Sequence, residues 1–201
     1  MHRLFFALWP QSELQIALAR AVQEIVRGCN GRAIPAQNLH ITLAFLGSVP
    51  EKNIGHVAAV AMEVAGELKG ERVRISLDAA EHWKKAHLVC ATARAPAVPS
   101  ADHGSDGGSG DHARADRGDY RDRTEYKLAA TLKSRLTAAG FAPDLKPFRP
   151  HVTLARGAHH PPRLTKMEPV IWCFTDFVLA DSKTHPDGSV YTILRRFAFA
   201  Q

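Results

Sequence analysis

Apolar residues fall in short runs along the chain, and these runs predict seven strands. The runs are rich in aromatic and β-branched residues, which favour a strand over a helix. The predicted strands cover residues 3–8, 38–47, 73–80, 87–93, 151–156, 174–182 and 189–199. Gly47 ends the second strand, and the turn-rich segment 183–188 joins the last two into a hairpin.

Other segments repeat apolar residues at helical spacing. In the first, Leu14, Leu18 and Val22 recur along one face. Gly140 follows the last of these segments and is a typical residue at the C-terminal end of a helix. The predicted helices cover residues 12–27, 51–68 and 124–140.

The resulting order is β-α-β-α-β-β-α-β-β-β, which predicts an α+β fold with helices packed on an antiparallel sheet. Composition changes between residues 96 and 122, where Val98 and Tyr120 are almost the only large apolar residues. We expect this segment to be a flexible surface insertion.

Bulk properties agree with one globular domain, or one domain built of two similar lobes. The chain has 201 residues, of which 45% are hydrophobic, and no apolar run approaches the roughly 20 residues that span a membrane. The three cysteines are scattered, which argues against a disulfide framework or a cysteine-based zinc site. We therefore expect a cytoplasmic protein. The net charge of +6 is compatible with a polyanionic partner such as RNA.

Two strands carry a histidine followed two residues later by a threonine. The first is "NLHITLAFLG", with His40 and Thr42, and the second is "PFRPHVTLAR", with His151 and Thr153. Side chains alternate along a strand, so each histidine shares a face with its threonine while the apolar neighbours point into the core. One such stretch is most simply a satisfied polar pair on a sheet. Two such stretches, both of which continue as "TLA", point to a shared function.

A pair of histidines on facing strands suits the hydrolysis of a phosphate diester. One neutral imidazole can accept a proton from water while the other, protonated, donates to the leaving oxygen. The threonine hydroxyls can hydrogen-bond the phosphoryl oxygens. A rival interpretation is a metal site, but no carboxylate accompanies either motif and the spacing is unusual for metal ligands. We expect neither a metal nor another cofactor.

These motifs resemble those of the 2H phosphoesterase superfamily, which has two such histidine–threonine motifs related by an internal pseudo-two-fold axis. The chain is most similar to the RNA 2′,3′-cyclic phosphodiesterases of bacteria and archaea, first described as 2′-5′ RNA ligases. The resemblance extends from the strand at 3–8 through both motifs to Ser182 and Tyr191. It implies a single bilobal domain, residues 1–201, with two pseudo-symmetric antiparallel sheet lobes, helices packed outside and a central cleft.

The resemblance also implies residue roles and a substrate. His40 would be the proton donor and His151 the proton acceptor, although the residues alone do not set this direction. Thr42 and Thr153 would bind the phosphate in the hydrolysis of a 2′,3′-cyclic phosphate to a 2′-phosphomonoester. The substrate would be an RNA, an oligonucleotide or a mononucleotide.

Two further residues are candidates for nucleotide binding. Arg156 matches a family arginine, but strict alternation places it opposite His151 unless the strand ends or bulges near Ala155. Phe5 is a candidate for stacking on a base, and its alternative is a place in the core. Arg149, two residues before His151, could share that histidine's face.

Two alternatives to hydrolysis stay open. The chain could be a nucleotide- or RNA-binding module without turnover, or it could join RNA ends by the reverse chemistry, 2′-5′ ligation. We expect a monomer that acts away from membranes.

Overall fold

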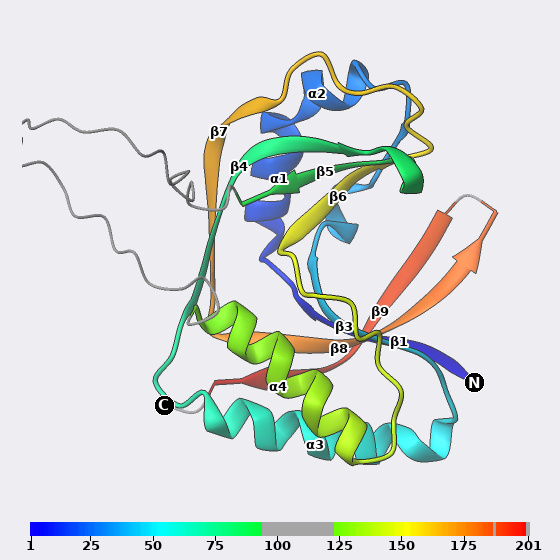
Figure 1. Ribbon diagram of the computed structural model, residues 1–201, viewed down its shortest axis with the longest axis vertical. Coiled ribbons are helices and arrows are strands. Elements are labelled where there is room, and N and C mark those ends of the chain that lie inside the picture. The colour runs from blue at the N-terminus through cyan, green and yellow to red at the C-terminus, as the bar shows by residue number, and fades with distance from the viewer. Residues whose placement is uncertain (94–122, 187, 200–201) are drawn as a thin grey trace, which may run out of the picture.

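The computed structural model describes residues 1–93, 123–186 and 188–199, and shows helices packed around a largely antiparallel sheet (Figure 1). The α+β class predicted from the sequence is confirmed. The predicted insertion at 96–122 lies outside the described residues. The strands are β1 (His2–Leu8), β2 (Arg32–Ala33), β3 (Ile41–Val49), β4 (Val73–Trp83), β5 (Leu88–Thr92), β6 (His151–Arg156), β7 (Lys166–Phe174), β8 (Asp176–His185) and β9 (Gly188–Ala198).

Helices occur where the helical spacing predicts them, with one interruption. The first predicted helix is divided at Val22, whose backbone leaves the helical region. The α-helices are α1 (Ser12–Ala21), α2 (Gln23–Arg27), α3 (Ile54–Glu67) and α4 (Thr124–Ala138). Short 3-10 turns are η1 (Ala36–Asn38), η2 (Glu51–Asn53) and η3 (Lys84–Ala86). Among the described residues, no helix is long and apolar enough to cross a membrane.

Apart from the short strand β2, the sheet consists of two four-stranded halves that meet at one point. Its order is β7-β4-β5-β6-β3-β1-β8-β9, with β2 paired to β6. Between β6 and β3, the two strands at the centre, the recorded register is a single pair, Ile41 with Val152. The halves are thus two lobes that separate on either side of this pair. Each lobe contributes one histidine motif at the junction.

The two motif strands have the same irregularity. Along β6, Val152, Leu154 and Ala155 are buried, and the pairing with β5 shifts between Ala155 and Thr153. Along β3, the pairing with β1 shifts between Ala44 and Thr42. Each strand therefore has a β-bulge after its threonine, and two consecutive residues point into the core.

The bulges decide where the following side chain points. After two buried residues in succession, alternation resumes with the opposite phase, so Phe45 on β3 and Arg156 on β6 return to the face of their histidines. Both side chains line the same hollow. The bulge near Ala155, which the sequence analysis required for Arg156 to share a face with His151, is therefore present.

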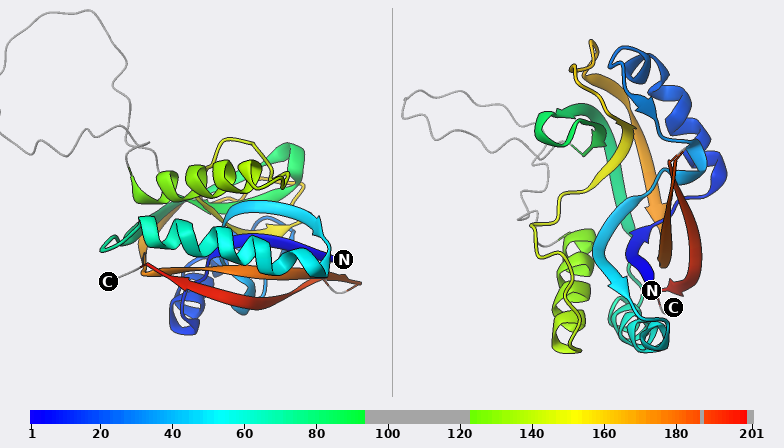
Figure 2. Two further views of the ribbon diagram at one scale, coloured as in Figure 1. Left: turned by 90° about the horizontal axis from the view of Figure 1, so that it is seen from below. Right: turned by 90° about the vertical axis from the view of Figure 1, so that its right-hand side faces the viewer.

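The two pairs of helices lie at opposite ends of the molecule (Figures 1 and 2). Buried apolar residues on α3 and α4 pack into the core beside β3 and β9. Helix α1 packs against β7 and η1. Each lobe therefore has helices packed on its part of the sheet, and the junction with the histidines lies between these two helical layers.

Strand β7 was not predicted. Its residues show no clean alternation, and Pro169 lies within it. Proline lacks an N–H for the ladder and is tolerated mainly at sheet edges and bulges. Both conditions hold, because β7 is an edge strand and its pairing with β4 shifts between Leu77 and Ala79.

Candidate active site

His40 lies immediately before β3 and is oriented by the backbone. Its Nδ1 lies 2.6 Å from the carbonyl oxygen of Asn38. A carbonyl can only accept, so Nδ1 carries the proton and donates, which leaves Nε2 free. Buried Gln15 of α1 steadies this segment, because its Nε2 donates to the carbonyls of Gln37 and Leu39 at 3.1 and 2.9 Å. A helix on one side of the sheet thus holds the backbone that orients the first histidine.

His151, the first residue of β6, is oriented in the same way. Its Nδ1 donates to the carbonyl oxygen of Arg149 at 2.8 Å. Both histidines therefore bond the residue two positions earlier and present Nε2, which can accept a proton when neutral and donate one when charged. The repeated geometry gives the site two equivalent groups for proton transfer.

Aromatic rings surround His40. The indole of Trp9 is stacked on its imidazole, with ring centres 4.8 Å apart and planes 3° apart. The rings of Phe5 and Tyr191 lie 5.1 and 5.2 Å away. Phe5 is only 3% exposed, so its ring backs His40 and has little open face. Stacking of Phe5 on a base stays a prediction, and Tyr191 is the more exposed of the two rings.

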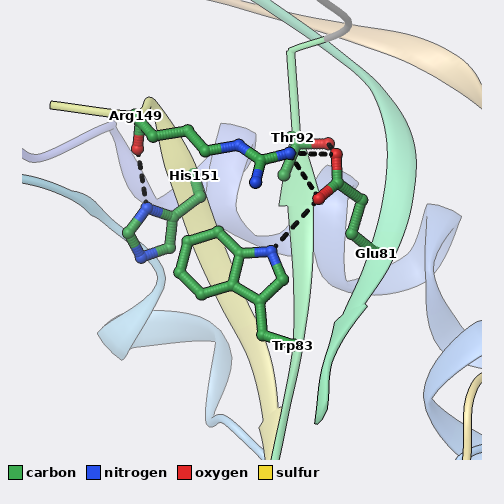
Figure 3. A network of polar contacts seen from close by, with 5 residues as sticks. All are labelled: Glu81, Trp83, Thr92, Arg149 and His151. Atoms are coloured by element: carbon green, nitrogen blue, oxygen red, sulfur yellow. Dashed lines mark hydrogen bonds and ion pairs between the residues drawn. The ribbon is translucent and has the colours of Figure 1, made fainter. Parts of the chain in front are cut away.

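A polar network supports His151 from β4 (Figure 3). Glu81 accepts hydrogen bonds from Arg149 at 2.5 and 2.6 Å, from the Trp83 indole at 3.1 Å and from Thr92 at 3.0 Å. The ring of Trp83 lies 4.4 Å from His151, centre to centre. The Arg149 guanidinium lies over Trp83 at 5.4 Å. Glu81 therefore fixes two groups that contact His151.

The protein environment lowers the pKa of both histidines. Burial lowers the pKa of His40 to about 4, against the opposing hydrogen bond to Asn38 and with added repulsion from His151 and Arg156. Burial is also the main cause that lowers the pKa of His151, while the Glu81 carboxylate raises it. Without a ligand, His40 is therefore neutral at pH 7.

Two hollows meet at Thr42, one on each side of the junction. The His151 hollow includes Thr42, Trp83 and His151 in its wall. The Ser182 hollow includes Thr42, Phe5, Arg156 and Ser182. Thr42 is thus placed to contact one ligand that reaches into both.

Thr153 shares the face of His151, as predicted from alternation. Its hydroxyl hydrogen-bonds the Cys90 thiol, whose burial raises the pKa of Cys90 to about 12. The thiol therefore stays protonated at pH 7. The structure brings His151 and Arg156 close enough to His40 to affect its charge, and Thr42 lines a hollow with each of them. Other histidines, such as His159 and His185, are exposed elsewhere.

Four supporting residues at this site were missed by the sequence analysis: Trp9, Gln15, Glu81 and Trp83. The strand predicted at residues 73–80 stops short of Glu81 and Trp83, whereas β4 continues to Trp83; two residues apart on that strand, Glu81 and Trp83 share a face. Nothing local indicates that this face meets His151, since the pairing of β5 with β6 spans a distant part of the chain.

Known proteins resemble this chain over nearly its whole length. The profile of the family described as LigT like Phosphoesterase matches residues 8–87. The RNA 2′,3′-cyclic phosphodiesterase of Thermus thermophilus is 30% identical, and the alignment covers 98% of this chain and 89% of that protein. The protein of the same name from Escherichia coli K12 is 28% identical over 99% of this chain and 97% of its own.

Solved structures agree with the sequence comparison. E. coli LigT in its apo form superimposes with a TM-score of 0.75 at 26% identity, covering 100% of this chain and 98% of that one. Its complex with 3′-AMP gives a TM-score of 0.74 at 26% identity, covering 100% and 99%. Taken with the paired histidine motifs at the lobe junction, these matches show that the chain belongs to the LigT-like, or 2H, phosphoesterase family.

Proposed function

We propose that this protein hydrolyses the terminal 2′,3′-cyclic phosphate of RNA or of a nucleotide to a 2′-phosphomonoester, without a metal. The observation that carries the proposal is the repeated geometry of His40 and His151. Each imidazole comes from the same position of a bulged strand, has Nδ1 bonded to a carbonyl, and presents Nε2 at the lobe junction. Acid and base are thus supplied by one arrangement used twice.

In the proposed reaction, His151 accepts a proton from a water molecule while the oxygen of that water attacks phosphorus. The bond from phosphorus to the 3′ oxygen breaks, and His40 donates the proton that this oxygen needs. Thr42 and Thr153 hydrogen-bond the non-bridging oxygens, where charge accumulates in the transition state. General acid and base catalysis would each contribute about 10²- to 10⁴-fold.

A proton donor with a pKa of about 4 would be mostly uncharged at pH 7. In the free protein, this value favours His40 as the base, which is the reverse of the role implied by the family resemblance. A bound phosphate diester carries a negative charge, and a negative charge beside an imidazole raises its pKa. We propose that the substrate itself charges His40 on binding.

The relatives support the nature of the substrate. Three curated relatives have the name RNA 2′,3′-cyclic phosphodiesterase, and E. coli LigT has been crystallised with 3′-AMP, ATP and NADP+. A nucleotide with its phosphate at Thr42 is consistent with the Ser182 hollow, which offers Arg156 and the Tyr191 ring.

The experiment is hydrolysis of a nucleoside 2′,3′-cyclic phosphate in EDTA, with the product identified by phosphorus NMR. We expect a 2′-phosphate, lost in His40→Ala and His151→Ala and kept in His160→Ala, a control at an exposed histidine. Binding of the 2′-phosphate product should survive in both active-site variants. Equal loss of binding and turnover would favour the binding module, and a 2′-5′ linked product from added 5′-hydroxyl RNA would favour ligation.

The direction of proton transfer needs its own test. A substrate with sulfur in place of the 3′ oxygen has a leaving group that needs no proton. If His40 is the donor, His40→Ala should regain activity on this substrate while His151→Ala should not. Rescue of His151→Ala instead would exchange the two roles.

A further inference from the structure

A second anionic group of the substrate has a place beside the site. Arg32 on β2 and Arg156 on β6 are directly opposite each other in antiparallel register. Side chains of such a pair lie on one face with their Cβ atoms about 5 Å apart. Both arginines line a hollow, here called the Arg32 hollow, together with Asn38, Ser189 and Tyr191.

These arginines are not neutralised by the part of the chain that the structure describes. There, neither forms an ion pair with a carboxylate. Like charges directly opposite on neighbouring strands destabilise a sheet, and β2 is only two residues long. A ligand with negative charge between the two guanidinium groups would remove that repulsion.

The position of Arg32 is defined by the other lobe. Its guanidinium lies against Gly188, where a Cβ would be 3.6 Å from Nη1. Next to it, the Asn38 side chain donates to the Ser189 carbonyl at 3.1 Å. Residues of β9 therefore form one wall of the Arg32 hollow, and the hydrogen bond from Asn38 ties this strand to the segment that orients His40.

The Arg32 hollow lies next to the Ser182 hollow of the candidate active site. It shares Arg156, Ser189 and Tyr191 with the Ser182 hollow, which extends to Thr42. A nucleotide whose cyclic phosphate lies at Thr42 has one other position for a phosphate on the same ribose, the 5′ oxygen. Arginine side chains bind phosphate groups well, and the Arg32 hollow is next to the one that reaches Thr42. The phosphate on the 5′ oxygen is therefore the group of an RNA end that suits this arginine pair.

We propose that Arg32 and Arg156 bind the phosphate on the 5′ oxygen of the terminal nucleotide. Resting on the proposed function, this inference names the preferred substrate: a cyclic-ended oligonucleotide, in which that phosphate links to the next nucleotide, rather than a nucleoside cyclic phosphate.

The experiment compares kcat/KM for three substrates: uridine 2′,3′-cyclic phosphate, the same nucleoside with a 5′-phosphate, and the dinucleotide UpU with a 2′,3′-cyclic end. We expect about a 10-fold advantage for each substrate that has the additional phosphate, since a charge-assisted hydrogen bond contributes about that much. Arg32→Ala should abolish the advantage, and Arg32→Lys should keep part of it. Arg20→Ala, which removes the same charge from the exposed end of α1, should keep all of it.

Equal kcat/KM for the three substrates, or an unchanged advantage in Arg32→Ala, would overturn the proposal. An advantage confined to the 5′-phosphorylated nucleoside would overturn the oligonucleotide preference. Absence of all turnover would contradict the proposed function instead. The phosphate subsite would then be tested by ligand binding. Tighter binding of adenosine 3′,5′-bisphosphate than of 3′-AMP, lost in Arg32→Ala, would still support the phosphate subsite, and equal binding of the two would refute it.

Discussion

At the scale of single residues, the site depends on how two imidazoles are held. Carbonyl acceptors fix Nδ1 of His40 and His151, and aromatic rings reduce their hydration. Trp9 is stacked on one histidine and Trp83 contacts the other. Loss of hydration disfavours the charged form and so lowers the pKa of each ring.

The lowered pKa values predict an acidic optimum for kcat/KM, which reports the free protein. Protonation of the acid is lost as the pH rises, so the rate should already decline below 6.5, the ordinary pKa of histidine. The optimum of kcat should lie at higher pH, because the negative charge of the bound phosphate raises the pKa of both histidines. Profiles from pH 4 to 9 test this. A kcat/KM optimum above pH 7 would contradict the burial argument.

Glu81 should act through Trp83 and Arg149. Glu81→Ala removes the acceptor of both side chains, and we expect kcat to fall about 10- to 100-fold, as small misplacements of catalytic groups do. Glu81→Gln keeps an acceptor but loses the charge that raises the pKa of His151. One limb of the pH profile should then move to lower pH, the acidic limb if His151 is the base. Glu67→Gln, at an exposed ion pair, is the control, and unmoved limbs in Glu81→Gln would exclude the electrostatic role.

At the scale of elements, bulged strands and one helix position the two histidines and the side chains around them. The bulge in β6 turns Arg156 back to the face of His151, and the corresponding bulge in β3 does the same for Phe45. Helix α1 contributes through a buried amide, Gln15, which bonds the backbone on both sides of Asn38.

Replacing Gln15 by Leu should affect both stability and rate. Two carbonyls would lose their donor in a buried place, which costs about 1–3 kcal/mol of unfolding free energy. The segment before His40 would also lose its anchor, so kcat should fall while Gln23→Leu, an exposed change on α2, leaves it unchanged. Urea unfolding and steady-state kinetics measure the two effects. A loss of stability with full kcat would restrict Gln15 to packing.

At the scale of the whole molecule, two lobes meet at one residue pair and each supplies one histidine. Neither lobe alone contains both groups for proton transfer. The Ser182 and Arg32 hollows likewise take residues from both lobes, such as Arg156 from one and Tyr191 from the other. The proposed activity therefore depends on the relative position of the two lobes.

The histidines of the two lobes should act as one unit. We expect each single alanine variant to lose about 10²- to 10⁴-fold in kcat/KM. The kcat/KM of the double variant His40→Ala/His151→Ala should be only slightly lower than that of the less active single variant, because the effects of residues that act as a unit are strongly non-additive. Kinetics on a nucleoside 2′,3′-cyclic phosphate measure this. Losses that multiply would mean that the two histidines act in independent steps.

Much of the architecture was predictable because its signals are local. Strand and helix periods place most elements, and the order of elements predicts the α+β class. Strand β7 escaped because Pro169 and its irregular pattern hide it, and it depends on pairing with β4. Its buried Trp172 packs in the core although its indole N–H finds no partner among the described residues.

By itself the sequence determined which side of each motif strand is core and which carries histidine and threonine, because a strand alternates with a period of two. The tertiary structure decided the rest: that the two motifs meet, that a bulge aims Arg156 at them, and that Glu81 supports His151 and Arg32 faces Arg156. Each of these depends on pairing between segments far apart in the chain. No local pattern of residues encodes such pairing.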